Sequence, residues 1–338
     1  MEILILGMDE MKTSIFLICF LLYCPSAFAN IVNSDQIYTY EQMQFDIQKL
    51  KVTYDGELEV TVIGQSYYGN DIPAIKIGKG KKNVVLIGAH HGREWLTSSL
   101  LMVMLENYVR SFTTGAKVGA FDSNMLNDVS IWIVPMLNPD GVKIQQRDIP
   151  VFFVDQLFLM NEGDSNFSRW KANGIGIDLN RQYPAGWREL KGPGTPAYQF
   201  YKGKRPFEAL ETQALAAFID KIQPSIAVAY HSTGQEIYWK YKNGKNEQRD
   251  YSIAEKIAQS TGYKLGKPPK KATGGGFTDW FITTYHRPAL TIEICPPMIN
   301  RAPPLSSFPE VWKRNQYVGM KLVNEVIELH KREGQMEK

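Results

Sequence analysis

His91 and Glu94 belong to the stretch VVLIGAHHGREWLT, in which apolar and small residues lead directly into a cluster of ionisable side chains. Because the two residues are three positions apart, their side chains point the same way on a tight turn or a first helical turn. An imidazole and a carboxylate that converge on one point can bind a divalent ion. His90 remains an alternative to His91, because its spacing to Glu94 also fits a helix. Taken alone, the pair also fits a salt bridge at a helix start.

A third candidate metal ligand, His231, ends the apolar stretch SIAVAYH. By itself, a histidine at the end of a strand is as typical of a hydrogen-bonded cap as of a ligand. His91, Glu94 and His231 together provide two imidazoles and one carboxylate. Zinc binds this set of ligands in catalytic sites and keeps a fourth position for water. The sequence therefore predicts a zinc site, provided that the fold brings these strand ends together.

Hydrophobic patterning predicts alternating strands and helices around these residues. Strands are expected over residues 58–64, 72–78, 83–89, 129–136, 225–231 and 288–294. Helices are expected over residues 39–50, 95–112, 205–222, 251–262 and 308–331. This alternation predicts an α/β fold with a mixed, largely parallel central sheet flanked by helices. The early strands are expected to pair antiparallel, because their connections are too short for crossover helices.

Polar residues follow several of the predicted strands at the point where each strand ends. They are HHGRE at residues 90–94, NPDG at 138–141, HSTG at 231–234 and Glu293 within TIEI. In open α/β sheets, sites form beyond the carboxyl ends of the strands. These polar groups are therefore expected to gather at one site.

The N-terminal region has the pattern of a secretory signal peptide. The stretch MKTSIFLICFLLYCPSAFAN begins at Met11 with a lysine, continues with an apolar segment and reaches an AFA motif that ends at Ala29. Met11 is an alternative start, because the preceding residues are partly acidic and suit a signal poorly. The apolar segment is short for a transmembrane helix, and a retained anchor is the alternative. We expect cleavage after Ala29, no stable membrane span afterwards, and a secreted or extracytoplasmic protein.

The rest of the chain has the composition of an ordinary globular protein. Hydrophobic residues make up 44% of the 338 residues and charged residues 22%, while the net charge of +3 gives no indication of a nucleic-acid or membrane-surface binder. Without repeats or linkers, the chain is expected to comprise a signal peptide over residues 1–29 and a single catalytic domain over 30–338. Cys295 would then be the one remaining cysteine, without an internal disulfide, and it is expected to be buried and inert.

Five motifs together resemble those of the zinc carboxypeptidase family. HHGREW, NPDG, DLNRQYP, YHS and TIE occur in the order seen in that family, and the resemblance runs from about Tyr38 to about Arg301. The stretches RWKANGIGIDLNRQYPAGW and HSTGQEIYW are most similar to a bacterial branch, the γ-D-glutamyl-L-diamino acid endopeptidases, which cut cell-wall peptides. The resemblance implies the family's fold and one zinc ion per chain.

The resemblance also implies a role for each residue near the metal. His91, Glu94 and His231 would be the zinc ligands, a choice that favours His91 over His90. Glu293 would be the general base. A carboxylate in this position can take a proton from water and deliver it to the leaving amine.

Four further residues receive roles from the same motifs. Asn180 and Arg181 of DLNR would hold a substrate carboxylate, and Arg93 would line the substrate side of the metal. Asp178 would accept a hydrogen bond from His91, which suits the acceptor that a ligand histidine usually needs. The sequence departs from the animal enzymes near their oxyanion-stabilising arginine, where a loose alignment puts Lys171, and near their site tyrosine, where it puts Lys271 or its neighbours.

These observations predict a zinc metallopeptidase of the bacterial cell envelope. Its expected substrate is a peptidoglycan stem peptide, cleaved at the γ-D-glutamyl-L-diamino acid bond. A metallocarboxypeptidase that removes C-terminal residues from ordinary peptides is the alternative. A catalytically silent wall-binding protein on the same fold is disfavoured, because such a protein need not keep Glu293 and three candidate ligands.

Overall fold

The computed structural model describes residues 30–148, 154–267 and 273–336. The chain divides into two units, Met1–Ile31 and Val32–Lys338, and the second contains the sheet and helices that position the site. The expected signal peptide, residues 1–29, and Lys271 lie outside the described residues.

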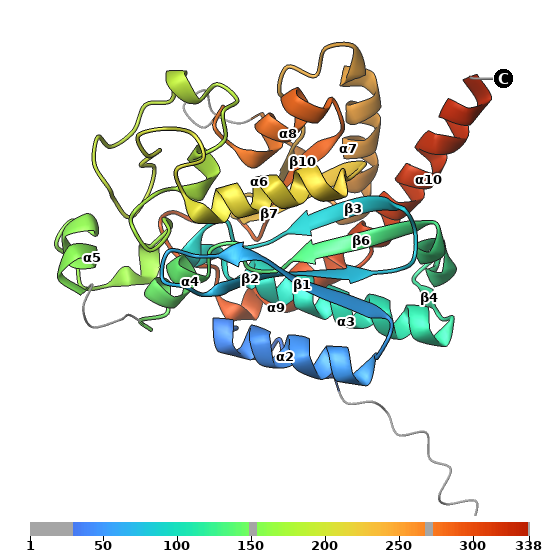
Figure 1. Cartoon of the computed structure of the whole chain (residues 1–338), viewed down its shortest axis with the longest axis horizontal. Helices are drawn as coiled ribbons and strands as arrows, with labels where there is room; N and C mark the ends of the chain where they lie inside the picture. Colours follow the sequence, from blue (N-terminus) through green and yellow to red (C-terminus); the bar gives the residue numbers. More distant parts are fainter. Residues whose placement is uncertain (1–29, 149–153, 268–272, 337–338) are drawn as a thin grey trace, which may run out of the picture. The chain divides into compact units, whose positions relative to one another are not determined.

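A mixed sheet with the order β1-β2-β6-β3-β7-β10-β8-β9 forms the centre of the second unit (Figure 1). Its strands are β1 (Leu58–Gln65), β2 (Asp71–Ile77), β3 (Lys82–Ile87), β6 (Val129–Val134), β7 (Ile226–Ser232), β8 (Glu236–Tyr238), β9 (Lys264–Leu265) and β10 (Ala289–Ile294). A separate ribbon pairs β4 (Lys117–Val118) with β5 (Phe121–Asp122). The central strands β6, β3, β7 and β10 are parallel, whereas β1, β2 and β6 pair antiparallel. The expected mixed, largely parallel sheet with antiparallel early strands is confirmed.

The central strands are apolar along their length because both of their faces are covered. Every residue of β6 and β7 is buried, and β3 is buried from Val84 onward. Parallel strands with helices on both faces need apolar side chains on both sides, which removes the alternation seen in half-exposed strands.

Helices cover both faces of the sheet (Figure 1). They are α2 (Tyr40–Thr53), α3 (Leu96–Thr114), α4 (Pro139–Gln145), α5 (Val154–Met160), α6 (Leu210–Ile222), α7 (Glu247–Thr261), α8 (Phe277–Tyr285), α9 (Phe308–Asn315) and α10 (Val318–Met336). On one face α6 and α8 pack on the sheet through a core that includes Phe218, Phe277 and Trp132. The helices α2 and α3 lie on the opposite face.

The C-terminal segment corrects one prediction, because residues 308–331 form two helices instead of one. α9 ends at Asn315 and α10 starts at Val318. At the break, the Tyr108 hydroxyl donates to the Gln316 carbonyl at 2.9 Å and accepts from the Gly319 N–H at 3.1 Å. The tyrosine therefore satisfies backbone groups that a continuous helix would have paired internally.

The start of α6 also differs from the prediction, since the helix begins at Leu210 and not at Arg205. Phe207 has a positive φ of 53°, which interrupts helical geometry. The Ala209 N–H donates to the side-chain oxygen of Gln182 at 2.9 Å, so a distant residue caps the helix.

Two further features bear on the sequence predictions. Cys295 is buried and free of a disulfide, as expected. Within the part of the chain that the structure describes, no helix combines the length and the apolar character required to cross a membrane.

Candidate active site

The candidate site residues lie where β3, β7 and β10 end. His91 follows β3 in an extended conformation and precedes a 3-10 helix, η1 (Gly92–Glu94), which carries Glu94. His231 lies near the end of β7, and Glu293 pairs with it in the parallel register of β10. Three segments far apart in the sequence thus bring these four side chains to one edge of the sheet.

The NPDG motif, at residues 138–141, holds η1 in place. Asn138 caps α4 by accepting from the Gly141 N–H at 2.9 Å, and its amide donates to the His90 carbonyl at 3.1 Å. A Cβ atom on Gly92 would lie 2.2 Å from the Gly141 carbonyl oxygen, so this close approach requires glycine at position 92. The motif therefore fixes the turn that carries the first two candidate ligands, and it does not line the cavity in front of them.

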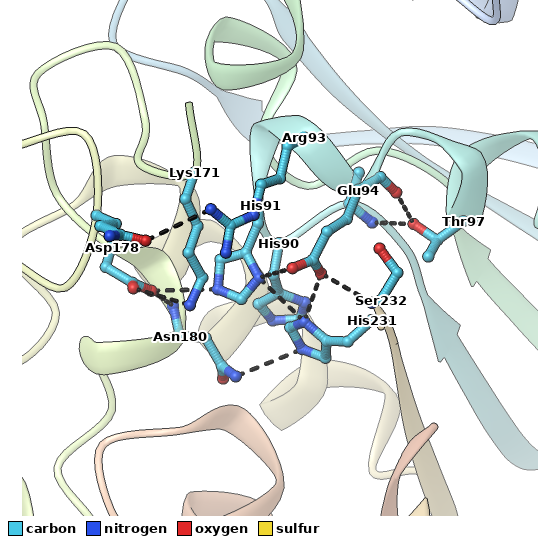
Figure 2. Close-up of polar contacts among 12 residues, drawn as sticks. His90, His91, Arg93, Glu94, Thr97, Lys171, Asp178, Asn180, His231 and Ser232 are labelled. Carbon is cyan, nitrogen blue, oxygen red and sulfur yellow. Dashed lines mark hydrogen bonds and ion pairs between the residues drawn. The ribbon is translucent and has the colours of Figure 1, made fainter. Parts of the chain in front are cut away.

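His91, Glu94 and His231 form a group of buried side chains that could hold a metal ion (Figure 2). Glu94 Oε1 lies 2.8 Å from His91 Nδ1, and Glu94 Oε2 lies 2.9 Å from His231 Nδ1. The two Nδ1 atoms are 3.1 Å apart. Burial would raise the pKa of Glu94, but the two histidines outweigh it and hold that pKa well below its usual range. Two imidazole nitrogens and an ionised carboxylate that converge in this way fit zinc.

His90 is not a member of this group and packs on neighbouring rings. Its ring centroid lies 5.8 Å from that of Phe277 and 5.2 Å from that of His231. Its Nε2 atom is 3.4 Å from the Tyr183 hydroxyl, and its Nδ1 atom has no hydrogen-bond partner among the described residues. Burial lowers the pKa of His90 well below its usual value, so this side chain is a neutral part of the core.

Asp178 lies against the far nitrogen of His91 (Figure 2). Its Oδ1 atom is 3.2 Å from His91 Nε2 and accepts from the Asn180 N–H at 3.1 Å. Its Oδ2 atom is 3.3 Å from Lys171 Nζ and accepts from the Phe200 N–H at 3.2 Å. Burial would raise the pKa of Asp178, but Lys171 and His91 hold it well below the usual range. An ionised acceptor at Nε2 favours a proton on that nitrogen, which leaves Nδ1 of His91 free to coordinate a metal together with Glu94.

Glu293 has the electrostatic environment of a proton acceptor that works near neutral pH. Burial raises its pKa to about 7, with a further contribution from Glu94, while His231 acts in the opposite direction. A carboxyl with a pKa near the working pH can both take up and release a proton in a reaction. Glu293 also lines the cavity described next.

A cavity of about 280 Å³ opens in front of the candidate metal group. Its lining residues include His91, Arg93, Glu94, Lys171, Asn180, Arg181, Phe200, His231, Tyr238, Thr278, Asp279, Thr291, Glu293 and Met298. The hydroxyls of Thr278 and Thr291 lie 2.7 Å apart. The cavity is therefore polar on several sides and combines cationic, anionic and hydroxyl groups.

Arg93 lies at the rim of this cavity and is held by neutral acceptors. Its Nη1 atom donates to the Arg169 carbonyl at 3.1 Å, and lies 3.4 Å from the side-chain oxygens of Gln199 and Asn300. Because these acceptors come from three different segments, the guanidinium is fixed in place.

Asn180 and Arg181 belong to a second 3-10 helix, η5 (Leu179–Arg181). The Asn180 side-chain oxygen accepts from the Phe277 N–H at 3.0 Å, and its amide nitrogen lies 3.4 Å from His231 Nε2. Arg181 donates to the Asn180 carbonyl at 2.8 Å. The structure thus orients the Asn180 amide nitrogen and the Arg181 guanidinium toward the same cavity, where both could donate to an anion.

Several cavity residues carry no signal that sequence patterning could have used. Tyr238 lies on β8, a strand of three residues, and Phe200 lies in a segment without regular structure and has a positive φ of 66°. Asp279 has its pKa raised to about 6 by burial. The sequence indicates Lys171 only through a loose alignment, and it does not predict the ion pair of Lys171 with Asp178.

Comparisons with known proteins agree with this geometry. The zinc carboxypeptidase family matches residues 43–318. A γ-D-glutamyl-L-diamino acid endopeptidase from Lysinibacillus sphaericus is 33% identical over 270 residues, which cover 78% of this chain and 67% of that protein. Metallocarboxypeptidase A from Trichophyton rubrum is 27% identical over 252 residues, which cover 68% of this chain and 56% of that protein. The resemblance expected from the five motifs is confirmed.

Solved structures of carboxypeptidases share the fold. Thrombin-activatable fibrinolysis inhibitor superimposes with a TM-score of 0.73 at 18% identity, covering 89% of this chain and 78% of its own. Carboxypeptidase A from Helicoverpa armigera gives a TM-score of 0.64 at 18% identity, covering 93% of this chain and 81% of its own.

Proposed function

The chain belongs to the zinc carboxypeptidase family of metallopeptidases, and we propose that it hydrolyses bacterial cell-wall peptides at the γ-D-glutamyl-L-diamino acid bond. The observation that carries the proposal is the polar cavity in which Glu293 faces the candidate metal group. The 33% identity to a γ-D-glutamyl-L-diamino acid endopeptidase supports the choice of substrate.

We assign His91, Glu94 and His231 as the ligands of one zinc ion. The family uses zinc, and the buried, ionised donor set described above fits that ion. When bound, zinc polarises a carbonyl and lowers the pKa of a bound water to roughly 7. Asp178 holds the Nε2 proton of His91 and so keeps Nδ1 free to coordinate.

Glu293 moves the proton in this proposal. Its carboxylate takes a proton from the attacking water and later delivers it to the leaving amine of the diamino acid. Burial raises the pKa of Glu293 above the usual range of a carboxyl, which supports a role in accepting a proton.

Asn180 and Arg181 bind the substrate carboxylate on the diamino-acid side of the cleaved bond. A guanidinium binds a carboxylate through paired N–H groups, and the neighbouring amide adds another donor. Arg93 lines the substrate path at the rim of the cavity. The partner is thus a peptide that carries at least one free carboxylate.

The place of action follows from the N-terminal pattern. Residues 1–29 have the basic, apolar and AFA segments of a secretory signal, which would bring the enzyme to the cell envelope, where peptidoglycan is. Residues 30–338 would act there as a single catalytic domain.

A metallocarboxypeptidase acting on ordinary peptides is the second candidate. The 27% identity to a fungal metallocarboxypeptidase favours it, and so does the carboxylate-binding pair. The Thr278–Thr291 hydroxyl pair in the cavity does not suit a large apolar C-terminal side chain. We therefore favour the wall peptide as substrate.

Incubation of the zinc-loaded protein with defined muropeptides, with products identified by mass, tests the choice. We expect two products: L-Ala-γ-D-Glu, and either the free diamino acid or a peptide that begins with the diamino acid. Faster release of C-terminal Phe or Lys from α-linked peptides would favour the carboxypeptidase instead.

A further inference from the structure

Three cations line the cavity, and the proposed peptide contact with Asn180 and Arg181 uses one of them. Arg93, Lys171 and Arg181 all line it, and among the described residues Asp178, which is 3.3 Å from Lys171, is the one carboxylate in an ion pair with them. The acceptors that bond the Arg93 and Arg181 guanidinium groups are neutral. Beside the carboxylates Glu94, Asp279 and Glu293 of the same lining, Arg93 and Lys171 therefore remain as cations that could bind a second anionic group of a substrate.

A γ-linked glutamyl residue brings such a second anion close to the cleaved bond. Its side-chain carboxyl forms the scissile amide, so its α-carboxylate stays free on the acyl side of that amide. The terminal carboxylate of an ordinary peptide lies on the leaving-group side, and an α-linked residue has its α-carboxyl inside the peptide bond. A cation on the acyl side could therefore distinguish the two linkages.

Resting on the proposed function, we infer that Lys171 is a specificity-determining residue that binds the free α-carboxylate of the γ-D-glutamyl residue. Figure 2 shows the Lys171 side chain beside His91, on the side of Asp178 and away from Glu94. The backbone fixes this position, since the Gly92 N–H donates to the Lys171 carbonyl at 3.1 Å and the Lys171 N–H donates to the Tyr198 carbonyl at 2.9 Å. The ammonium is thus held next to the turn that carries the candidate metal ligands.

The ammonium of Lys171 keeps donor capacity for a substrate. It has three N–H groups, and Asp178 is its one carboxylate partner at ion-pair distance among the described residues. The carboxylate of Asp178 also contacts His91 and accepts from the N–H groups of Asn180 and Phe200. Lys171 is only 7% exposed, and its ammonium lies 4.8 Å from the centre of the Phe200 ring. Asp178 offsets only part of its charge. In this position the ammonium attracts an incoming carboxylate more strongly than a solvated lysine does.

The other two cations fit this role less well. Arg93 is fixed by acceptors from three segments at the rim. Arg181 lies next to Asn180 and completes the carboxylate pair assigned to the diamino-acid side. Lys171 and the candidate ligand His91 both contact Asp178, which places the ammonium next to the candidate metal group.

Two substrates that differ only in the glutamyl α-carboxylate test whether Lys171 binds this group. We would measure kcat/KM of the zinc-loaded full chain on L-Ala-γ-D-Glu-L-Lys and on the same peptide with the glutamyl α-carboxyl amidated. Wild type is expected to prefer the free acid by on the order of tenfold or more, as for other charged hydrogen bonds. Lys171→Met should bring the ratio of the two substrates close to one, and Lys171→Arg should keep much of the preference.

The ratio separates substrate recognition from a general role of Lys171. If Lys171 stabilised the oxyanion or merely supported Asp178, Lys171→Met would slow both substrates equally and the ratio would persist, which overturns the inference. Equal rates of wild type on the acid and the amide overturn it as well, without any variant, and leave the proposed function intact. Cleavage of neither γ-linked peptide by zinc-loaded wild type overturns the proposed function itself, and the inference with it. Zinc content and thermal unfolding of each variant are checked first, and Lys171→Gln replaces the Met variant if the latter loses zinc.

Discussion

Glu293 lies directly beside His231 in the parallel pairing of β10 with β7. Because side chains of a strand alternate between faces, a shift of one residue in this register would move Glu293 out of the cavity. The sheet register therefore determines that the candidate base and a candidate zinc ligand face the same site. Burial in this position also raises the Glu293 pKa to about 7.

Removing two of the assigned ligands should abolish metal binding. Wild type is expected to hold about one zinc per chain, and a His91→Ala, His231→Ala double variant should hold little, because a single carboxylate seldom retains zinc. Metal analysis of purified protein provides the measurement. His286→Asn, which changes an exposed histidine, serves as control and should keep its zinc. Stoichiometric zinc in the double variant would contradict the assignment.

Glu293→Gln should separate metal binding from catalysis. Glutamine keeps the shape of the side chain but cannot carry the proton, so zinc should stay and kcat should fall by about 10²–10⁴-fold. The matched control is Glu236→Gln, because Glu236 pairs with Glu293 on the neighbouring strand β8. If the Glu293 variant turns over at a near-normal rate and the Glu236 variant does not, Glu236 is the base.

Arg181→Ala should weaken binding of the substrate carboxylate in the transition state. Loss of a desolvated charged contact costs on the order of 2–5 kcal/mol, read from the ratio of kcat/KM values. Arg188→Ala removes an exposed arginine nearby and should have little effect. Similar kcat/KM values for the Arg181 variant and wild type would show that the carboxylate binds elsewhere.

Glu211, at the start of α6, should make stability depend on pH. Burial raises its pKa from 4.5 to about 7, with Asp140 adding to the shift and the Asn173 side chain opposing it. Because the folded-state pKa is the higher one, the folded protein binds more protons between these values. The stabilisation is complete below about 4.5 and is lost as the pH rises through about 7. It amounts to on the order of 3 kcal/mol.

Chemical denaturation of wild type and Glu211→Gln from pH 4.5 to 8 tests this dependence. The free energy of unfolding of wild type should fall relative to that of the variant as the pH rises, since glutamine stays neutral and can still accept from Asn173. Glu189→Gln, at an exposed position, should follow wild type. Parallel curves for wild type and Glu211→Gln would mean that folding does not change the pKa of Glu211.

The sequence predicted the central strands well because parallel strands leave a strong signal. β3, β6 and β7 are buried on both faces, so each appears as a continuous apolar run. β8 and β9, with three and two residues, are too short to show periodicity. The break between α9 and α10 depends on the hydroxyl of Tyr108, a residue far away in the sequence.

The candidate site was predictable to the extent that its residues follow strand ends. Spacing alone does not distinguish His90 from His91. In the structure, His91 contacts Glu94 and Asp178, whereas His90 packs on Phe277. The Lys171–Asp178 pair and the position of Phe200 depend on how irregular segments fold over the sheet. No local pattern encodes such contacts, because their partners lie in other segments.

A comparison of two linkage isomers tests which glutamyl bond the enzyme cleaves. L-Ala-γ-D-Glu-L-Lys and L-Ala-α-D-Glu-L-Lys have the same atoms and differ only in which glutamyl carboxyl forms the amide. We would measure kcat/KM for lysine release from each with zinc-loaded protein, and Glu293→Gln as the inactive reference. We predict zinc-dependent cleavage of the γ-linked isomer at least tenfold faster than that of the α-linked one, the ratio set by roughly 1.4 kcal/mol of selective binding. Equal or faster cleavage of the α-linked isomer would contradict this prediction.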